Sequence, residues 1–165
     1  MSAAYDPEQW HDLFVAVAGA SAALLGLLFV AVSINLERIL SYKGLPERAL
    51  ETLLLLLLVL IVSIFGLIPG QSSLALGLEV LVVAALAAAV ILRLPSAAPD
   101  QAGQPATWRL SRLGIRVTGT VPLAIGGLAV LLEAGGGLYW VGAGIVLAIC
   151  GAVANAWVLL VEILR

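Results

Sequence analysis

Three polar side chains inside apolar runs are the residues of this sequence best able to do chemistry. Glu79 interrupts the run that ends at Arg93, whereas Asn155 and Glu162 lie in the last run of the chain. A carboxylate or an amide in hydrocarbon is unfavourable unless it is hydrogen-bonded, so such groups mark helix contacts or ion pathways. We expect Asn155 to bond to another helix, and we treat Glu79, Asn155 and Glu162 as a candidate polar pathway. For Glu79 itself the favoured interpretation is a side chain that extends to the membrane surface or makes a structural hydrogen bond, and a proton or cation site is the alternative.

A cluster of arginines precedes the fourth apolar run. Arg109, Arg112 and Arg116 share one face of a predicted helix, because they are three and four residues apart. A voltage sensor has a comparable spacing, but only Arg116 approaches the apolar part of the helix, and we identify no acidic helix to compensate it. A basic cluster beside a membrane span is typical of binding to anionic lipid headgroups. We therefore assign these three arginines to headgroup binding.

Catalytic and metal-binding patterns have almost no support in this sequence. His11 is the only histidine and has no second ligand at helical spacing, and no Ser–His arrangement or phosphate-binding loop occurs. The single cysteine, Cys150, lies in an apolar run, which predicts a small core residue and excludes an intrachain disulfide. We predict a non-enzymatic protein with no catalytic residue, cofactor, bound metal or nucleic-acid partner.

The composition indicates the environment in which these groups must be positioned. Of the 165 residues, 62% are hydrophobic and 11% are charged, and the mean hydropathy is +1.15. Soluble globular domains have about 25% charged residues. The sequence therefore predicts an all-α integral membrane protein, a bundle of transmembrane helices embedded in the lipid bilayer.

The chain is predicted to form a single transmembrane domain, residues 1–165, with five spans. Each apolar run approaches or exceeds the ~20 residues that a helix needs to cross ~30 Å of hydrocarbon, and Pro or Gly residues separate the runs. Three prolines and the lack of apolar periodicity predict a cytoplasmic loop at residues 95–108. The predicted spans are residues 12–36, 50–68, 73–93, 110–133 and 138–163.

The basic residues predict the orientation of these spans. With five spans, all eight Lys and Arg residues fall on the same side of the membrane. By the positive-inside rule that side is cytoplasmic, so we predict an outside N-terminus and a cytoplasmic C-terminus. The residues concerned are Arg38, Lys43, Arg48, Arg93, Arg109, Arg112, Arg116 and Arg165.

Small residues gather on one face of several predicted helices. In the first span this face lies opposite a bulky face that includes Leu24 and Leu28. A small face lets another helix approach closely in lipid, where no hydrophobic effect drives helices together. We predict helix-packing interfaces, within a protomer or between protomers, at Gly19, Ala23, Gly26, Gly119, Gly126, Gly144, Ala148 and Gly151.

Three segments carry a resemblance to known proteins. They are WHDLFVAVAGASAALLGLLFVAVSINLERIL, LPERALETLLLLL and LIPGQS, with Trp10, Gly19, Gly26, Ser33, Asn35, Pro69 and Gln71 as the matching residues. The sequence resembles a group of small, largely uncharacterised bacterial polytopic membrane proteins. The resemblance implies a multi-pass protein of the bacterial inner (plasma) membrane, and it implies no activity, cofactor or catalytic residue.

Two classes of function are consistent with these patterns. The first is a non-enzymatic scaffold or modulator of a membrane complex, which acts through helix–helix contacts as a homo-oligomer or with another membrane protein. Its basis is the excess of small helix faces over ionisable groups. The alternative is an oligomeric ion channel or small transporter that uses Glu79, Asn155 or Glu162, and it requires these groups to converge.

Overall fold

The computed structural model describes residues 3–94 and 106–164, without the side chains of residues 106–112 and 162–164. All regular structure in these ranges is helical, which confirms the predicted all-α class. Five helices are long and apolar enough to cross a membrane. The long helices are α1 (His11–Ile34), α3 (Leu45–Gly66), α4 (Ser73–Arg93), α5 (Ala106–Leu131) and α6 (Leu138–Leu164), and the short ones are η1 (Ala3–Tyr5), η2 (Pro7–Trp10) and α2 (Leu36–Ser41).

The connection between the first two spans is more helical than the sequence predicted. Residues of this charged segment form α2 and the first turns of α3, so α3 begins at Leu45 instead of near residue 50. Gly44, the residue before α3, adopts the left-handed conformation (φ 91°), and Pro46 lies in the first turn of α3. Proline is tolerated there because the first helical N–H groups have no partner within the helix. Glu51 therefore belongs to α3 and enters the bundle.

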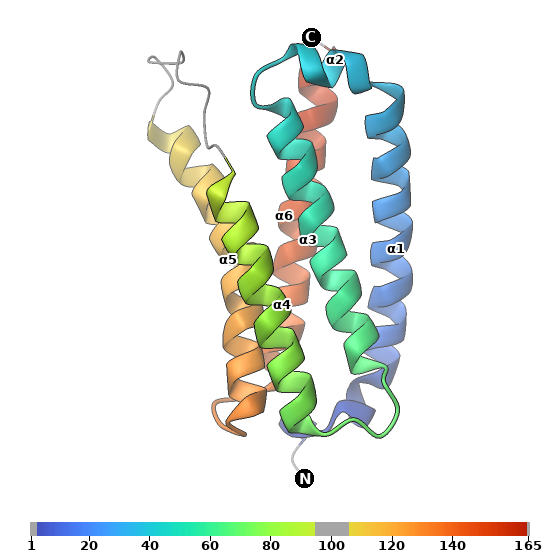
Figure 1. The fold of residues 1–165 in the computed structure, drawn as a ribbon, viewed down its shortest axis with the longest axis vertical. Helices are drawn as coiled ribbons and strands as arrows, with labels where there is room; N and C mark the ends of the chain where they lie inside the picture. The colour runs from blue at the N-terminus through green and yellow to red at the C-terminus, as the bar shows by residue number, and fades with distance from the viewer. Residues whose placement is uncertain (1–2, 95–105, 165) are drawn as a thin grey trace.

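Long helices that follow one another in the chain run antiparallel, and together the long helices form an elongated bundle (Figure 1). The ends of the described chain lie at opposite ends of the bundle. We call them the α2 end, where α2 lies across the bundle and α6 finishes, and the η2 end, where η2 and the loops at residues 67–72 and 132–137 lie. Helix α3 packs against α1, α4 and α6, and α5 packs against α4 and α6.

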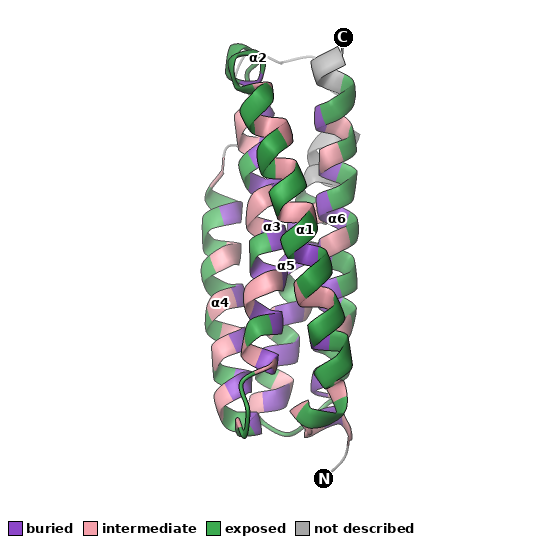
Figure 2. Ribbon diagram, turned by 90° about the vertical axis from the view of Figure 1, so that its right-hand side faces the viewer, coloured by how far each residue is buried: buried purple, intermediate pink, exposed green. Residues whose placement is uncertain are grey.

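Helices α1 and α3 differ sharply in how much they bury. In α3, twelve of 22 residues are buried, whereas α1 buries only Phe14 and Ser21 of its 24 residues. Most of the α1 surface is exposed in the view that faces it (Figure 2). Helices α3 to α6 thus form a four-helix unit, and α1 is added at its edge through contacts with α3.

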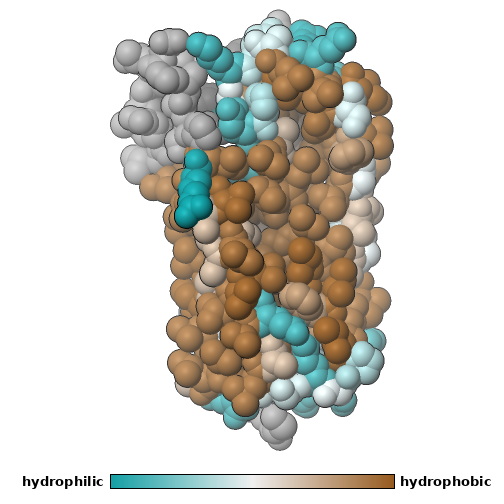
Figure 3. Space-filling view, viewed as in Figure 1, coloured by the Kyte–Doolittle hydropathy of each residue, from teal (hydrophilic) through white to brown (hydrophobic). Residues whose placement is uncertain are grey.

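Many large hydrophobic side chains are exposed on the outside of the bundle. In the face shown in Figure 3, brown side chains cover the middle of the molecule and hydrophilic ones gather toward both ends. Such a band is what lipid requires of a spanning surface. Cys150 belongs to this exposed surface of α6, so the prediction of a core position for it is wrong. The reason is that both sides of a lipid-facing helix are apolar, and an apolar run does not distinguish core from lipid.

Candidate functional site: a buried ion pair at the α2 end

The most unusual chemical feature of the bundle is a fully buried carboxylate. Glu51 in the second turn of α3 has 0% of its surface exposed. Its Oε2 accepts a hydrogen bond from Arg116 Nε of α5 at 3.0 Å, and the two side chains form an ion pair. Its Oε1 accepts a hydrogen bond from Asn155 Nδ2 of α6 at 3.1 Å. Both carboxylate oxygens are therefore occupied by donors from two other helices.

Arg116 extends this cluster to a fourth helix. Its Nη1 donates to the carbonyl oxygen of Leu94, the residue that follows α4, at 3.0 Å. The guanidinium is itself buried, with Arg116 only 1% exposed. Hydrogen bonds to charged groups are stronger than neutral ones, and those inside a bundle are shielded from water. We call Glu51, Arg116 and Asn155 the buried cluster; it joins α3, α5 and α6 directly and α4 through Leu94.

Small residues beside the buried cluster let these helices approach closely. A Cβ added to Gly119 of α5 would lie 2.8 Å from Leu55 Cδ2 of α3, and one added to Gly151 of α6 would lie 3.0 Å from Ile115 Cγ2. Both glycines are buried. A larger residue at either position would push apart the helices that bring Glu51, Arg116 and Asn155 together.

The chemistry of the buried cluster favours a structural role. A carboxylate whose oxygens both accept hydrogen bonds and whose surface is closed to solvent has no open position for a substrate. Removing one partner of such a pair leaves an uncompensated charge in a low-dielectric interior, which is strongly destabilising. We infer that the buried cluster fixes the rotation of the four helices about their axes and their register along the bundle.

The cluster corrects two interpretations of Arg116. The spacing of the arginines predicted lipid headgroups, and no acidic helix, as the surroundings of Arg116, but its side chain is turned inward onto Glu51. The other two arginines of that prediction, Arg109 and Arg112, have side chains outside the described residues. A signal in the sequence was the position along the bundle axis. Each of the three residues of the buried cluster lies a few turns from the α2 end of its helix, so all three lie at a similar level.

The predicted polar pathway is not assembled within the described residues. Glu79 lies near the η2 end, where Gln71 Nε2 donates to its Oε2. Asn155 lies in the buried cluster near the α2 end, and the side chain of Glu162 is outside the described residues. A buried apolar cluster that includes Val59, Leu123 and Ala148 occupies the bundle between these two levels. The structure thus places Glu79 and Asn155 apart.

A second polar contact lies at the η2 end. Ser73 Oγ at the start of α4 donates to Glu133 Oε1, which follows α5, at 2.8 Å. Glu133 is exposed and has a positive φ of 48°. Both groups lie at the ends of their helices, and Ser73 is buried whereas Glu133 is exposed. They resemble ordinary boundary contacts more than the enclosed pair at the α2 end.

The small residues of α5 and α6 lie in close helix contacts. A Cβ on Gly144 would lie 2.8 Å from Leu123 Cγ, and one on Gly126 would lie 2.7 Å from the backbone nitrogen of Val141. Ala148 is completely buried. Helices α4 and α5 also approach closely, because a Cβ on Gly77 would lie 2.5 Å from the backbone nitrogen of Leu131 and one on Gly127 would lie 2.6 Å from the backbone nitrogen of Leu81. Gly127 was not singled out in the sequence.

The small residues of α1 lie in the opposite situation. Gly19, Ala23 and Gly26 are exposed, and a Cβ added to either glycine would meet nothing within 4 Å. The bulky face of α1 is the one that packs on the bundle, with Phe14 in the core. The described part of the chain therefore offers these three residues no helix to pack against.

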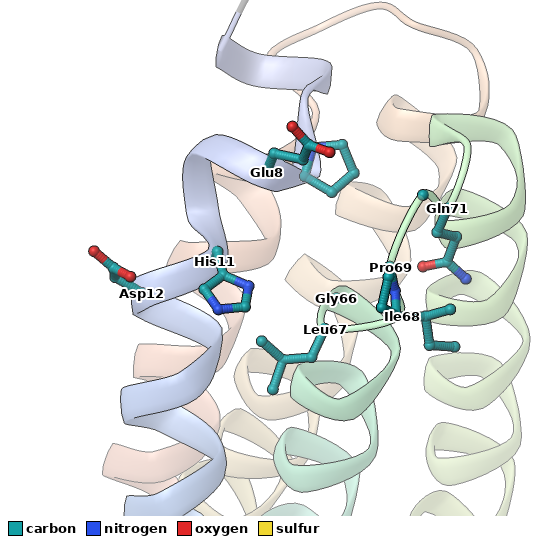
Figure 4. A pocket seen from close by; sticks show the side chains of 10 residues that line it. Glu8, His11, Asp12, Gly66, Leu67, Ile68, Pro69 and Gln71 are labelled. Carbon is teal, nitrogen blue, oxygen red and sulfur yellow. The ribbon is translucent and has the colours of Figure 1, made fainter.

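A depression of about 470 Å³ lies at the η2 end between the start of α1 and the loop after α3. In Figure 4 the His11 side chain lies on the side of α1 that faces the loop after α3, whereas the Asp12 carboxylate points to the opposite side. Within the described residues no group of three or more His, Cys, Asp or Glu side chains could hold a metal ion. Because its carboxylates do not converge, this depression lacks the geometry of a cation site.

Comparison with known proteins adds no identity to this geometry. The chain matches no model of a protein family, no curated protein and no solved structure.

Proposed function

We propose that the protein is a non-enzymatic membrane protein that assembles with a second copy of itself through the small face of α1. This face consists of Gly19, Ala22, Ala23 and Gly26. The observation that carries the proposal is the direction of the face, since all four residues are exposed and point away from the bundle. A close-packing surface on a helix to which the described residues offer no neighbour on that side is explained by a neighbour from outside the protomer.

The spacing of the face supports helix packing. Gly19 and Ala23, like Ala22 and Gly26, are four residues apart, which places two small pairs on adjacent rows of one helix side. Such pairs allow two backbones to approach until dispersion and Cα–H contacts accumulate, which is the force that associates helices in lipid. Contact with lipid alone makes no use of this shape.

A second copy fits this face because the face can match itself. Copies in one membrane share an orientation, so two α1 helices would meet about a two-fold axis along the membrane normal, as isologous contacts require. Small-residue helix pairs cross at about −40°. Asp12 lies on the same side of α1, ten residues from Ala22, or ~15 Å along the axis. The two crossed helices have moved apart at the level of Asp12, so the two Asp12 carboxylates would not be in close contact.

The rest of the chain suits a scaffold or modulator of a membrane complex. The buried cluster and the close contacts of α4, α5 and α6 give a rigid unit, and α1 presents one free face beside it. Charge segregation supports an outside N-terminus and a cytoplasmic C-terminus. We place the protein in a bacterial inner membrane on the resemblance of its first three spans to small polytopic proteins.

The alternative function, an ion channel or transporter, has no observation in its favour among the described residues. Transport needs a path on which protein oxygens or water replace the ion's hydration shell. Glu79 and Asn155 lie toward opposite ends of the bundle, with apolar side chains of the core between them. A path formed between protomers would still have to recruit one of these groups.

Cysteine crosslinking tests the proposed contact directly. In a background without Cys150, Ala22→Cys places a thiol on the small face, and Ala85→Cys places one on the exposed side of α4. We expect oxidation in native membranes to give disulfide dimers from Ala22→Cys and not from Ala85→Cys. Equal crosslinking of the two variants, or none from Ala22→Cys, contradicts a specific α1 pair.

A pair of glycine variants tests whether the small shape is needed. Gly19→Leu and Gly26→Leu fill the face, and Gly114→Leu is the matched control because Gly114 is also exposed with nothing within 4 Å of its Cβ position. We expect the first two variants to be monomeric by single-molecule photobleaching in lipid and Gly114→Leu to remain dimeric. If all three variants assemble as the native protein does, α1 is not the interface.

A further inference from the structure

The structure contains an apolar groove between α1 and α6 that no part of the described chain fills. Its volume is about 220 Å³. It lies beside the α2 end, because its α6 wall is in the last turns of that helix. Helix α1 packs against α3 and leaves this gap toward α6. The lining includes Leu24, Leu28 and Ala31 of α1 and Ala156, Leu159 and Leu160 of α6.

The length and surface of the groove suit a hydrocarbon chain. From Leu24 to Asn35 it follows eleven residues of α1, or ~17 Å at 1.5 Å per residue. One leaflet accounts for half of the ~30 Å hydrocarbon core. The groove thus extends from near the middle of the membrane to one surface, as a single acyl chain does, and its lining is almost entirely aliphatic.

A polar depression adjoins the groove at the α2 end of the bundle. Asn35, at the bend between α1 and α2, lines both the groove and this second depression. Arg38 and Glu37 also line the depression. Arg38 is exposed and makes no ion pair with any residue of the described ranges. An exposed arginine at the end of an apolar groove is complementary to a phosphate attached to an acyl chain.

We propose that the α1–α6 groove binds an anionic phospholipid, with one acyl chain between α1 and α6 and the phosphate at Arg38. Hydroxyls of a polyol headgroup, such as the glycerol of phosphatidylglycerol, can donate to the Glu37 carboxylate. The negative charge of this carboxylate disfavours a headgroup with a second negative charge beside it. Helix α2 lies across the end of the bundle (Figure 1), so Arg38 is held at the level of lipid headgroups.

The acyl-chain groove lies on the other side of α1 from the proposed α1 pair, whereas Ser33 of the polar depression follows Gly26 by seven residues and lies on the same side as Gly26. Leu28 follows Gly26 by two residues, so the groove side and the small face are about 200° apart around α1. Filling the groove side with an acyl chain leaves the small face open to a second copy. Loss of assembly and loss of lipid binding are therefore separate results, each obtained with its own variants.

Lipid titration of the purified protein in detergent tests the proposal, with native mass spectrometry as the readout. The probes are phosphatidylglycerol, phosphatidylcholine with the same chains, and glycerol 3-phosphate. We expect phosphatidylglycerol to bind more tightly than phosphatidylcholine, and glycerol 3-phosphate to bind far more weakly than either. Equal binding of the two lipids, or full binding of glycerol 3-phosphate alone, overturns the proposal.

Two pairs of variants separate the headgroup from the chain. Arg38→Gln should weaken phosphatidylglycerol binding about fivefold, the factor equivalent to the ~1 kcal/mol of one basic residue near an anionic surface. Arg93→Gln, an exposed arginine at the same end on α4, should leave it unchanged. Equal losses in the two variants would show nonspecific attraction and overturn the site.

The chain contact is tested by filling the groove. Ala156→Phe should weaken binding of both lipids, while Ala85→Phe on the exposed side of α4 should weaken neither. Ala31→Phe fills the groove from the α1 wall and replaces Ala156→Phe if that variant does not fold. Unchanged lipid binding in a folded, filled variant overturns the proposed position of the acyl chain.

Discussion

The four-helix unit and α1 use the same small residues in opposite ways. In the unit, a Cβ on Gly144 or Gly127 would collide with atoms of the next helix, so these glycines set how closely the helices approach. In α1, a Cβ on Gly19 or Gly26 would meet only open space. A glycine in a membrane helix therefore indicates a contact only after its direction is known, and the direction separates contacts inside a protomer from contacts available to a partner.

The four-helix unit and α1 also differ in their polar contacts. The buried cluster ties α3, α5 and α6 together and reaches the end of α4 through Leu94. No residue of α1 takes part in the contacts of this cluster that the described residues make. Buried ionic groups fix register and rotation in some systems. We infer that the unit is fixed by polar contacts and close backbone approach, and that α1 is held by apolar packing on α3.

The largest loss of stability is expected from breaking the buried ion pair. Arg116→Leu leaves the Glu51 carboxylate without its cation, which costs about 3–5 kcal/mol in the free energy of unfolding. Reversible unfolding in mixed detergent micelles measures this loss. Glu51→Leu combined with Arg116→Leu should cost less than Arg116→Leu alone, because no charge is then left uncompensated. A double variant less stable than the single one would contradict a buried, paired carboxylate.

Overfilling a closed glycine should have the next largest effect. Gly144→Leu forces a side chain into Leu123, whose Cγ lies 2.8 Å from the position of the new Cβ. Overpacking of this kind typically costs about 1–3 kcal/mol. Val146→Leu is the control, because Val146 is 59% exposed on the same helix. If the two variants unfold alike, the α5–α6 contact is looser than the structure indicates.

Much of the fold was predictable from the sequence for a simple physical reason. A bilayer requires about 20 apolar residues in a row and an internally bonded backbone, so the lengths of the apolar runs predict five helices. Helix α2 and the start of α3 at Leu45 were not predicted, because charged residues there interrupt the apolar runs that define the spans. Gly44 and Pro46 mark the start of α3.

The candidate site was predictable only in its separate parts. Arg116 and Asn155 were both singled out, but their partner Glu51 is 65 residues from one and 104 from the other. Periodicity gives the face of each helix and says nothing of which helices are neighbours or how they are rotated. For α1, both faces are apolar, so the sequence could not tell which one packs on α3 and which remains open.

A smaller effect is expected at the other end of the unit, from Glu79. Its carboxylate accepts a hydrogen bond from Gln71 and is only half-buried. In Glu79→Gln an amide oxygen can accept the same bond, so we expect a change within about 1 kcal/mol. Thermal unfolding in detergent measures the stability, and ion flux in liposomes measures transport. Selective flux that disappears in a folded Glu79→Gln variant would instead support the transport alternative.

The smallest effect on the protomer is expected from filling an open glycine. Gly19→Leu adds a side chain where no atom lies within 4 Å, so the free energy of unfolding of the dilute monomer should change by less than about 0.5 kcal/mol. The same chemical change at Gly144 is expected to cost several times more, because that position is closed by Leu123. Measuring both variants below the concentration at which the protein associates removes any contribution from assembly. A large loss for Gly19→Leu under these conditions would show that α1 packs on another part of its own chain, and the distinction between the two glycine faces would fail.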